Sequence, residues 1–502
     1  MTTIFGRRAR LLGTALGTIT LLSACAVGPD YERPSAAVPP AYKEAAFKES
    51  GVTPVAFAPP VPREDGWRPA APGQAEAGPW WTVFNDPVLD GLMRRVEVDN
   101  QSLKAAEAAY RQAKALSDQA RSGFFPVLSV NGGADRAGRV GSGNRSTSGA
   151  VSGMAASRSG TPVTTYDAGV GASWAPDLWG RIRRSVESND ANLQASAADL
   201  AAARLSAQAQ LATAYVQFRV ADERKALLER AIAAYRQSLE IARNRHAVGT
   251  ATLADVFTAE TQVRSTESQL VALGVQRAQF EHAMAVLVGQ PPAAFALAPA
   301  PLTAAVPAIP PGVPSALLER RPDIAAAERQ MAQANAQIGI AESAWYPDVV
   351  LSGSLTNSAT ILPRLLQAPT AIWAVGAQVA QTLFDGGTRT AEVELRRAVF
   401  DQTVAQYRQT VLTAFQEVED QLAAQRILAQ QATVQDDAVR LAREAERLTL
   451  NQYRAGTLPY SSVLTAQTAA LSDEESALSV RQSRLLAAVS LLQALGGAPP
   501  NF

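Results

Sequence analysis

The chain has 502 residues, with 46 basic and 46 acidic side chains, so its formal net charge at pH 7 is zero. A nucleic-acid-binding surface needs an excess of basic residues, and this balance excludes one. Apolar residues make up 47% of the chain but aromatic residues only 6%, which predicts closely packed helices with small contact residues and not a thick globular core.

Residues 1–24 have the composition of an export signal. Arg7, Arg8 and Arg10 precede an apolar run from Leu11 to Leu22, which is too short to span a bilayer. We therefore expect the chain to leave the cytoplasm by the general export route. A twin-arginine signal is the alternative that the Arg7-Arg8 pair offers.

Cys25 is the only cysteine, so it cannot form an intramolecular disulfide. It follows Leu22-Ser23-Ala24, where small residues mark a cleavage site. The stretch resembles the bacterial lipobox, which implies cleavage before Cys25 and acylation of its thiol and new amino group. Ala26 is similar to signals that sort lipoproteins to the outer membrane. An ordinary signal peptide with an incidental thiol is the alternative.

Residues 25–79 are rich in Pro, Ala and Gly and have no sustained period. They predict an extended segment that lies over other structure. Pro87 directly after Asp86 is typical of a helix start, and apolar residues follow at helical spacing. We expect this first helix to run to about Ser122.

After Pro126 the apolar period changes from helical to two. Apolar and small polar residues alternate after Pro126, over Tyr166–Trp174, after Pro347 and over Trp373–Ala380. A half-buried soluble sheet is one interpretation, but strands of about ten residues in an exported chain also suit tilted membrane strands. Four strands fall short of the minimum of about eight for a closed barrel, so several chains would contribute to one barrel.

Two long stretches predict helices of unusual length. No proline occurs from Arg181 to Val248 or from Thr388 to Ala455, and a helix of that length extends roughly 100 Å at about 1.5 Å per residue. No compact domain needs such helices, so we expect them to project and to pack against each other and against neighbouring protomers as a coiled-coil tube.

The sequence contains one element twice. Asn244–Thr261 recurs as Asn451–Thr468, and in each copy a helical pattern ends at a glycine, Gly249 or Gly456, where positive φ is favoured. Each copy therefore predicts a helical hairpin. Two threonines, Thr250 and Thr457, are predicted to cap the helix that follows.

The repeat extends beyond the hairpin tips. Ala120–Pro126 aligns with Ala341–Pro347, and the additional residues of the first copy fall in its polar stretch around GSGNRSTSGAVSG. We expect two tandem repeats. The predicted boundaries are 80–290 for repeat one, 291–314 for a Pro-rich linker and 315–502 for repeat two.

Four stretches carry a family resemblance: Cys25–Pro34 (CAVGPDYERP), Trp80–Leu92 (WWTVFNDPVLDGL), Leu318–Glu328 (LERRPDIAAAE) and Asn451–Thr457 (NQYRAGT). Together and in this order they resemble the outer-membrane factor (TolC-like) family. Within it they are similar to the OprM/NodT-type lipoprotein channels of tripartite resistance-nodulation-division (RND) efflux systems. The resemblance spans nearly the whole chain after the export signal.

The resemblance implies a homotrimer in the bacterial outer membrane, in which four strands from each of three chains form a twelve-stranded barrel. The resemblance also implies that the helices form a tunnel in the periplasm, with a mixed belt near the linker. Such channels are not enzymes. They are passive conduits for drugs or other small molecules, docked through a periplasmic adaptor (membrane fusion protein) to an inner-membrane RND transporter, and they open when the tip hairpins untwist. A type I secretion conduit is the alternative within the family, and an exported coiled-coil scaffold is the alternative outside it.

The resemblance also assigns the hairpin tips to the periplasmic end. Arg245 and Arg454 offer charge beside the tip glycines, which suits docking of an adaptor hairpin. Family members often carry an acid before the Ala466-Gln467 pair, where this chain has Thr465, so the candidate gate residues are Thr465 at that position and Asp255 on the other hairpin. The predicted adaptor contacts are Arg245, Gly249, Thr250, Arg454, Gly456 and Thr457.

No catalytic or metal site is predicted. His246 and His282 are the only histidines, and with one cysteine they offer no metal-ligand constellation. No nucleophile motif is recognisable. The only expected prosthetic group is the covalent lipid on Cys25.

Overall fold

The structure, a computed structural model, describes residues 26–35, 38–39, 41–44, 79–138, 162–307, 309, 320–365, 367 and 371–497. The export signal 1–24, Cys25 and the polar stretch 141–153 lie outside these residues. Contacts divide the chain into two compact units, each assembled from three segments. Unit 1 comprises residues 1–32, 114–192 and 331–402, and unit 2 comprises residues 33–113, 193–330 and 403–502. Each repeat of the sequence therefore contributes to both units.

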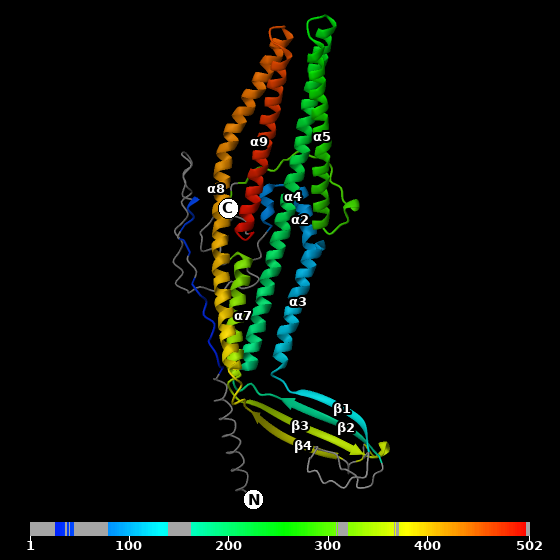
Figure 1. The fold of residues 1–502 in the computed structure, drawn as a ribbon, viewed down its shortest axis with the longest axis vertical. Helices are drawn as coiled ribbons and strands as arrows, with labels where there is room; N and C mark the ends of the chain where they lie inside the picture. Colours follow the sequence, from blue (N-terminus) through cyan, green and yellow to red (C-terminus); the bar gives the residue numbers. More distant parts are fainter. Residues whose placement is uncertain are drawn as a thin grey trace. The chain divides into compact units, whose positions relative to one another are not determined.

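The elements follow in chain order and are labelled in Figure 1. They are η3 (Trp80–Phe84), α2 (Pro87–Asp99), α3 (Gln101–Ser122), β1 (Val127–Ala137), β2 (Val163–Trp174), α4 (Arg181–Ala247), α5 (Leu253–Leu287), η4 (Pro292–Ala294), α7 (Pro322–Ser343), β3 (Asp348–Ala359), η5 (Leu362–Arg364), β4 (Ala371–Ala380), α8 (Thr388–Arg454) and α9 (Tyr460–Ala494).

Unit 1 contains one antiparallel sheet with the strand order β1-β2-β3-β4. The register pairs Val170 of β2 with Val130 of β1 and with Leu355 of β3, and Leu355 in turn with Trp373 of β4. Because neighbours in register share a face, these four apolar residues lie on the same side of the sheet. The predicted period-two strands are thereby confirmed. Among the described residues, β1 and β4 each keep one unpaired edge.

The two faces of the sheet differ in polarity. The face that contains Val170 also carries Leu128, Trp174, Leu351, Val375 and Val379, and these side chains are exposed in the single chain. The opposite face carries small and polar residues, among them Ser129, Asp167, Ser352, Ser354 and Gln378. The sheet therefore offers one continuous apolar surface and one hydrophilic surface.

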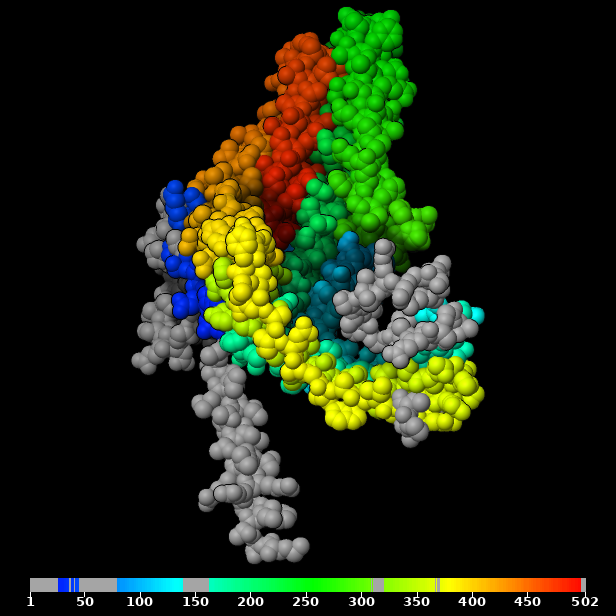
Figure 2. Space-filling view, turned by 60° about the horizontal axis from the view of Figure 1, so that its bottom comes forward, coloured from blue at the N-terminus to red at the C-terminus, as the bar shows by residue number. Residues whose placement is uncertain are grey.

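Unit 2 contains α5, α9 and all of α4 and α8 except their first residues, which belong to unit 1; these helices form two hairpins, α4–α5 and α8–α9. The predicted ends of α4 and α8 are confirmed to within one residue. Figure 2 shows the red surface of α9 against the green surface of the first hairpin, and two interactions join them. Arg224 of α4 pairs with Glu475 of α9 at 3.0 Å, and the Tyr235 hydroxyl of α4 donates to the Gln467 carbonyl of α9 at 3.2 Å.

The two hairpins repeat their internal ion pairs. Arg236 of α4 binds Glu267 of α5 at 2.7 Å, and the residues 207 positions later, Arg443 of α8 and Glu474 of α9, form the same pair. Surface pairs of this kind contribute little stability by themselves. Their recurrence shows that the sequence repeat is also a repeat of structure.

The first predicted helix is in fact two helices, which corrects the expectation of one helix to Ser122. The break is at Asn100, which has extended backbone angles. Its side-chain oxygen accepts from the Leu103 N–H at 3.0 Å, and its side-chain nitrogen donates to the Leu287 carbonyl at 2.8 Å. Asn100 therefore caps the start of α3 and the end of α5 together.

Candidate functional site at the hairpin tips and the apolar sheet

Both hairpin tips have the same backbone turn. Gly249 and Gly456 have φ values of 75° and 82°, as the sequence predicted. The next N–H groups reach back five residues, from Thr250 to the Arg245 carbonyl at 2.8 Å and from Thr457 to the Gln452 carbonyl at 3.0 Å. This is the Schellman motif, which satisfies carbonyls at the end of a helix and needs a residue free to adopt positive φ.

The threonines beside the tip glycines were expected to cap the helix that follows each tip, but they cap the helix that precedes it. The Thr250 hydroxyl donates to the Arg245 carbonyl at 3.0 Å, and the Thr457 hydroxyl donates to the Gln452 carbonyl at 2.9 Å. Both hydroxyls therefore cap the end of the preceding helix. The helix that follows begins at Leu253 in the first hairpin and at Tyr460 in the second, with Thr252 and Pro459 at the N-cap position, because the turn itself uses two further residues.

Arg245 is turned toward the second hairpin. Its guanidinium donates to the Tyr453 carbonyl of α8 and lies over the Tyr453 ring, with 4.7 Å between the guanidinium carbon and the ring centroid. The Tyr453 ring in turn meets the Tyr460 ring edge-on at 5.6 Å. Arg245 therefore links the two hairpins inside one chain.

A cluster of buried side chains supports this link. It draws on both hairpins and includes Tyr235, Leu239, Ala242, Val256, Ala259, Val263, Tyr453, Tyr460 and Val463. Burial raises the pKa of Tyr460 to about 12, so its hydroxyl stays neutral at physiological pH. Gln467 of α9 adds a buried hydrogen bond of 3.0 Å to the Ser238 hydroxyl of α4.

Sequence reasoning did not identify this inter-hairpin cluster. Tyr453 and Tyr460 flank the second tip at positions where the first copy has His246 and Leu253. The presence of two tyrosines in the second copy, where the first copy has His246 and Leu253, was the sequence signal that could have indicated this cluster.

The remaining predicted tip residues take different positions. Arg454 is exposed and makes no hydrogen bond or ion pair with any residue that the structure describes. Thr465 is exposed on α9 and donates to the Ser461 carbonyl of its own helix at 3.0 Å. Arg454 is thus the tip cation that is available to a partner.

Asp255 forms a capping box with Thr252. The Asp255 carboxylate accepts from the Thr252 N–H at 3.0 Å, and the Asp255 N–H donates to the Thr252 hydroxyl at 3.2 Å. The structure therefore gives Asp255 a role in starting α5. Its role as a gate residue stays a prediction.

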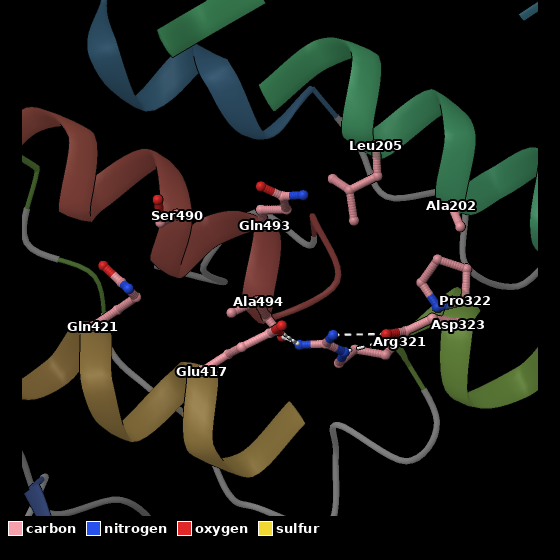
Figure 3. Close-up of a pocket in the computed structure, with 10 residues that line it drawn as sticks. All are labelled: Ala202, Leu205, Arg321, Pro322, Asp323, Glu417, Gln421, Ser490, Gln493 and Ala494. Atoms are coloured by element: carbon pink, nitrogen blue, oxygen red, sulfur yellow. Dashed lines mark hydrogen bonds and ion pairs between the residues drawn. The ribbon is translucent and has the colours of Figure 1, made fainter. Parts of the chain in front are cut away.

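A cavity of about 410 Å³ lies within unit 2, where α7 begins and α9 ends. Figure 3 shows its lining, with Arg321 between two acids. Arg321 binds Asp323 at 2.7 Å and Glu417 at 2.6 Å, and donates to the Ala494 carbonyl at 3.1 Å. Burial disfavours its charge, but these hydrogen bonds outweigh burial and raise the pKa of Arg321.

Arg321 therefore forms ion pairs at the start of α7 and caps the end of α9. The bond from Arg321 to the end of α9 corresponds to the bond from Asn100 to the end of α5. The cavity is lined by Ala202, Leu205, Arg321, Pro322, Asp323, Glu417, Gln421, Ser490, Gln493 and Ala494.

The described residues contain neither a cluster of metal ligands nor a membrane-spanning helix. No group of three or more His, Cys, Asp or Glu side chains is arranged to hold a metal ion there. In the same residues, no helix has both the length and the apolar character needed to cross a bilayer.

Comparison with known proteins assigns the chain to a family. Residues 92–290 and 313–497 match the model of the outer membrane efflux proteins. The chain belongs to this family. The match covers both repeats, so the resemblance to outer-membrane factors found in the sequence is confirmed.

Individual relatives of this outer membrane efflux protein agree with the assignment. The pyoverdine export outer membrane protein OpmQ of Pseudomonas aeruginosa is 31% identical over 448 residues, which are 87% of this chain and 93% of OpmQ. The probable efflux pump outer membrane protein TtgC of Pseudomonas putida is 29% identical over 96% of this chain and 94% of TtgC. The structure of the outer-membrane channel OprN matches with a TM-score of 0.80 and 28% identity, over 94% of this chain and 99% of OprN.

Membership fixes the general function. Outer membrane efflux proteins are channel components of tripartite efflux systems and not enzymes. This chain therefore belongs in the outer membrane and works with an adaptor and an inner-membrane transporter.

Proposed function

We propose that this outer membrane efflux protein is a passive, lipid-anchored, homotrimeric conduit. Its sheets form one barrel in the outer membrane, and its long helices form a periplasmic tunnel. The observation that carries the proposal is the sheet of unit 1, with its apolar face and its unpaired β1 and β4 edges. Open edges are not tolerated in lipid, so strands of other copies have to pair with them.

The number of copies follows from the width of the barrel. Each chain contributes a sheet of 4 strands. A barrel of about eight strands, from two copies, has an interior that side chains fill. A conduit therefore needs at least three copies, and the twelve-stranded barrel of a trimer is the smallest that leaves an aqueous passage.

A row of apolar residues on α8 supports the same assembly. Ile427, Val434, Leu441 and Leu448 follow one another at intervals of seven and are exposed in the single chain, Val434 to 72% and Leu441 to 59%. Apolar residues at this interval form the seam of a coiled coil. A row of this kind facing water would be costly, so another helix covers it in the assembly.

The repeat identifies that helix. In the first hairpin the equivalent residues of α4 include Val220 and Leu227, which are buried, and the Arg224–Glu475 pair places α9 beside them. Leu478 and Gln482 of α9 line the same cavity as Val220. The residues 207 positions earlier, Val271 and Val275 of α5, are 78% and 61% exposed. We infer that α5 of one copy covers the α8 row of the next copy, as α9 covers α4 within a chain.

Conductance tests the proposed function. The purified protein is expected to need detergent, to migrate as a trimer and to conduct ions in planar bilayers. A protein that dissolves once its lipid is removed, and gives no conductance, would instead be the coiled-coil scaffold.

The cargo is proposed from the relatives. OpmQ is described as a pyoverdine export protein and a TtgC protein of Pseudomonas putida as part of a toluene efflux pump, which supports small organic molecules as cargo. Co-purification of an RND-type transporter would support efflux, whereas co-purification of an ATP-driven exporter would support type I secretion. A drug-susceptibility panel on a deletion strain identifies the cargo.

Arg245→Ala is expected to loosen the tip. It removes the hydrogen bond and the ring contact that join the hairpins, a loss of about 1 kcal/mol, or roughly a fivefold shift of the closed–open equilibrium. Single-channel recordings should show a higher open probability. Arg243→Ala is the control, because Arg243 pairs with Glu260 inside its own hairpin at 3.2 Å. Equal open probabilities in the two variants would show that Arg245 does not hold the tip.

Arg454→Glu is expected to weaken adaptor binding and to leave trimers intact, because the side chain is exposed and without a partner among the described residues. Affinity for the purified adaptor, measured by surface plasmon resonance, is expected to fall with a lower association rate, as for a charge at the rim of an interface. Unchanged binding would remove Arg454 from the docking surface.

Cys25→Ser is expected to abolish incorporation of radiolabelled palmitate. The acyl chains require the thiol, and at about 0.8 kcal/mol per buried methylene two or more chains make anchoring effectively permanent. Labelling that persists in the variant would contradict the lipobox.

A further inference from the structure

The segment that follows Cys25 is bound by Arg184 of α4. The Arg184 side chain is only 6% exposed and forms an ion pair of 2.8 Å with Asp30. It also donates to the carbonyls of Val27 at 3.2 Å and Gly28 at 3.0 Å. A buried guanidinium that binds two carbonyls and a carboxylate fixes the position of this segment.

Two glycines allow the segment to approach the helices closely. Gly28 has a φ of 97°, and a Cβ there would overlap the backbone of Gly339 in α7. A Cβ on Gly180, just before α4, would lie 2.8 Å from the Ala26 Cα. Ala26 is therefore packed against Gly180, and the attachment point of any lipid on Cys25 lies one residue away.

Trp179 connects this attachment point to the sheet. The Val27 N–H donates to the Trp179 carbonyl at 3.1 Å. The Trp179 indole donates to the Pro347 carbonyl at 2.8 Å and stacks on the Tyr346 ring at 4.9 Å. Pro347 directly precedes β3, so the N-terminal segment is docked at the helix-side end of the strands.

A hollow of about 450 Å³ lies on the sheet near this end. Most of its lining is apolar and comes from the apolar face of β2, β3 and β4, and Ser173 and Ser352 of the opposite face also belong to the lining. Gly353 leaves its centre open, since a Cβ there would meet no atom within 4 Å. The side chains that line it from this face are Ala172, Trp174, Leu351, Val375 and Ala377.

The hollow lies within the depth of one membrane leaflet from the end of the sheet at which the segment after Cys25 is docked. From Pro347 to Leu351 the strand extends at most about 14 Å, at about 3.5 Å per residue. The acyl region of one leaflet is about 15 Å deep, half of the hydrocarbon core. The length and the apolar lining therefore suit a single saturated chain.

We propose that this hollow binds a fatty acyl chain carried by Cys25 of the same chain. The proposal rests on the proposed lipidation of Cys25. A covalently attached chain whose anchor is fixed beside the site has a high effective concentration there, so it occupies the hollow in preference to free phospholipid. The acyl chain then contacts its own protomer and not the bulk bilayer.

Photo-crosslinking tests the proposal. Cells are fed a palmitate analogue with a terminal diazirine, the protein is purified and irradiated, and the peptides joined to the labelled N-terminal peptide are mapped by mass spectrometry. In the unaltered protein we expect crosslinks to the strands that line the hollow. Gly353→Phe fills the hollow from the exposed face and is expected to reduce these crosslinks several-fold. Val130→Phe, on the same face of β1, is expected to leave them unchanged.

The other outcomes are distinguishable. Incorporated label with crosslinks spread evenly over the four strands would overturn the proposal and leave lipidation intact. Absence of label in the unaltered protein would overturn both the proposal and the lipidation of Cys25.

A second experiment distinguishes the attached acyl chain from free phospholipid. A photoactivatable phosphatidylethanolamine in proteoliposomes is expected to label the hollow in Cys25→Ser and not in the unaltered protein. Equal labelling of the two would make the hollow a general lipid site and overturn the proposal.

Discussion

The double variant Val434→Glu, Leu441→Glu is expected to be monomeric in mild detergent. Burying each of these side chains contributes about 1.5–3 kcal/mol, and a glutamate placed in a covered seam would also lose its hydration without gaining a partner. The interface recurs at every contact between copies in a closed ring. The loss therefore applies to all three contacts of the trimer.

Size-exclusion chromatography with light scattering measures the effect. In the control, Arg440 and Arg447 are changed to glutamate. Arg440 lies one residue before Leu441 and Arg447 six residues after it, so both face another side of α8 than the apolar row does. These arginines are exposed and pair within their own helix, with Asp437 and Glu444. The control is expected to remain trimeric. Trimers of unchanged stability in the Val434, Leu441 variant would refute the assignment of α8 to the contact between copies.

Gly289→Ala is expected to destabilise the protein far more than Gly249→Ala. Both glycines end a long helix with positive φ, 70° and 75°, and an alanine there costs about 1–2 kcal/mol for its backbone conformation. A Cβ on Gly249 would meet no atom within 4 Å, whereas a Cβ on Gly289 would overlap the Asp99 backbone. This overlap adds about 1–3 kcal/mol.

Thermal unfolding in detergent compares the two variants. Gly496→Ala is a second test, because Gly496 is the repeat equivalent of Gly289 and its Cβ would lie 2.8 Å from the Arg320 carbonyl oxygen. Its melting temperature is expected to fall as that of Gly289→Ala does. If all three variants melt together, the close approach of these helix ends contributes nothing to stability.

Much of the architecture was predictable from local patterns. The absence of proline from Arg181 to Val248 and the glycine at position 249 set the length of α4, because helix propensity and helix termination act within a few residues. The period-two alternation set the strands and their faces, because side chains alternate along any strand. The match of the two copies gave two similar hairpins.

The break at Asn100 was not predictable in the same way. Asn100 lies within a sequence of helical period, and at the break between α2 and α3 its side chain donates to the Leu287 carbonyl, 187 residues away. The direction of Arg245 is a similar case. A charged residue beside a tip glycine suggests a docking cation, but the Tyr453 carbonyl and ring of the other hairpin bind it inside the chain.

The sequence by itself determined which segments are helices and strands, where the hairpins turn and which face of each strand is apolar, because these depend on neighbours along the chain. Only the tertiary structure decided which polar groups meet across the hairpins, which tip arginine remains exposed and where the segment after Cys25 is held. Those outcomes depend on groups that are distant in sequence and become neighbours only when the helices pack, so no local pattern contains them.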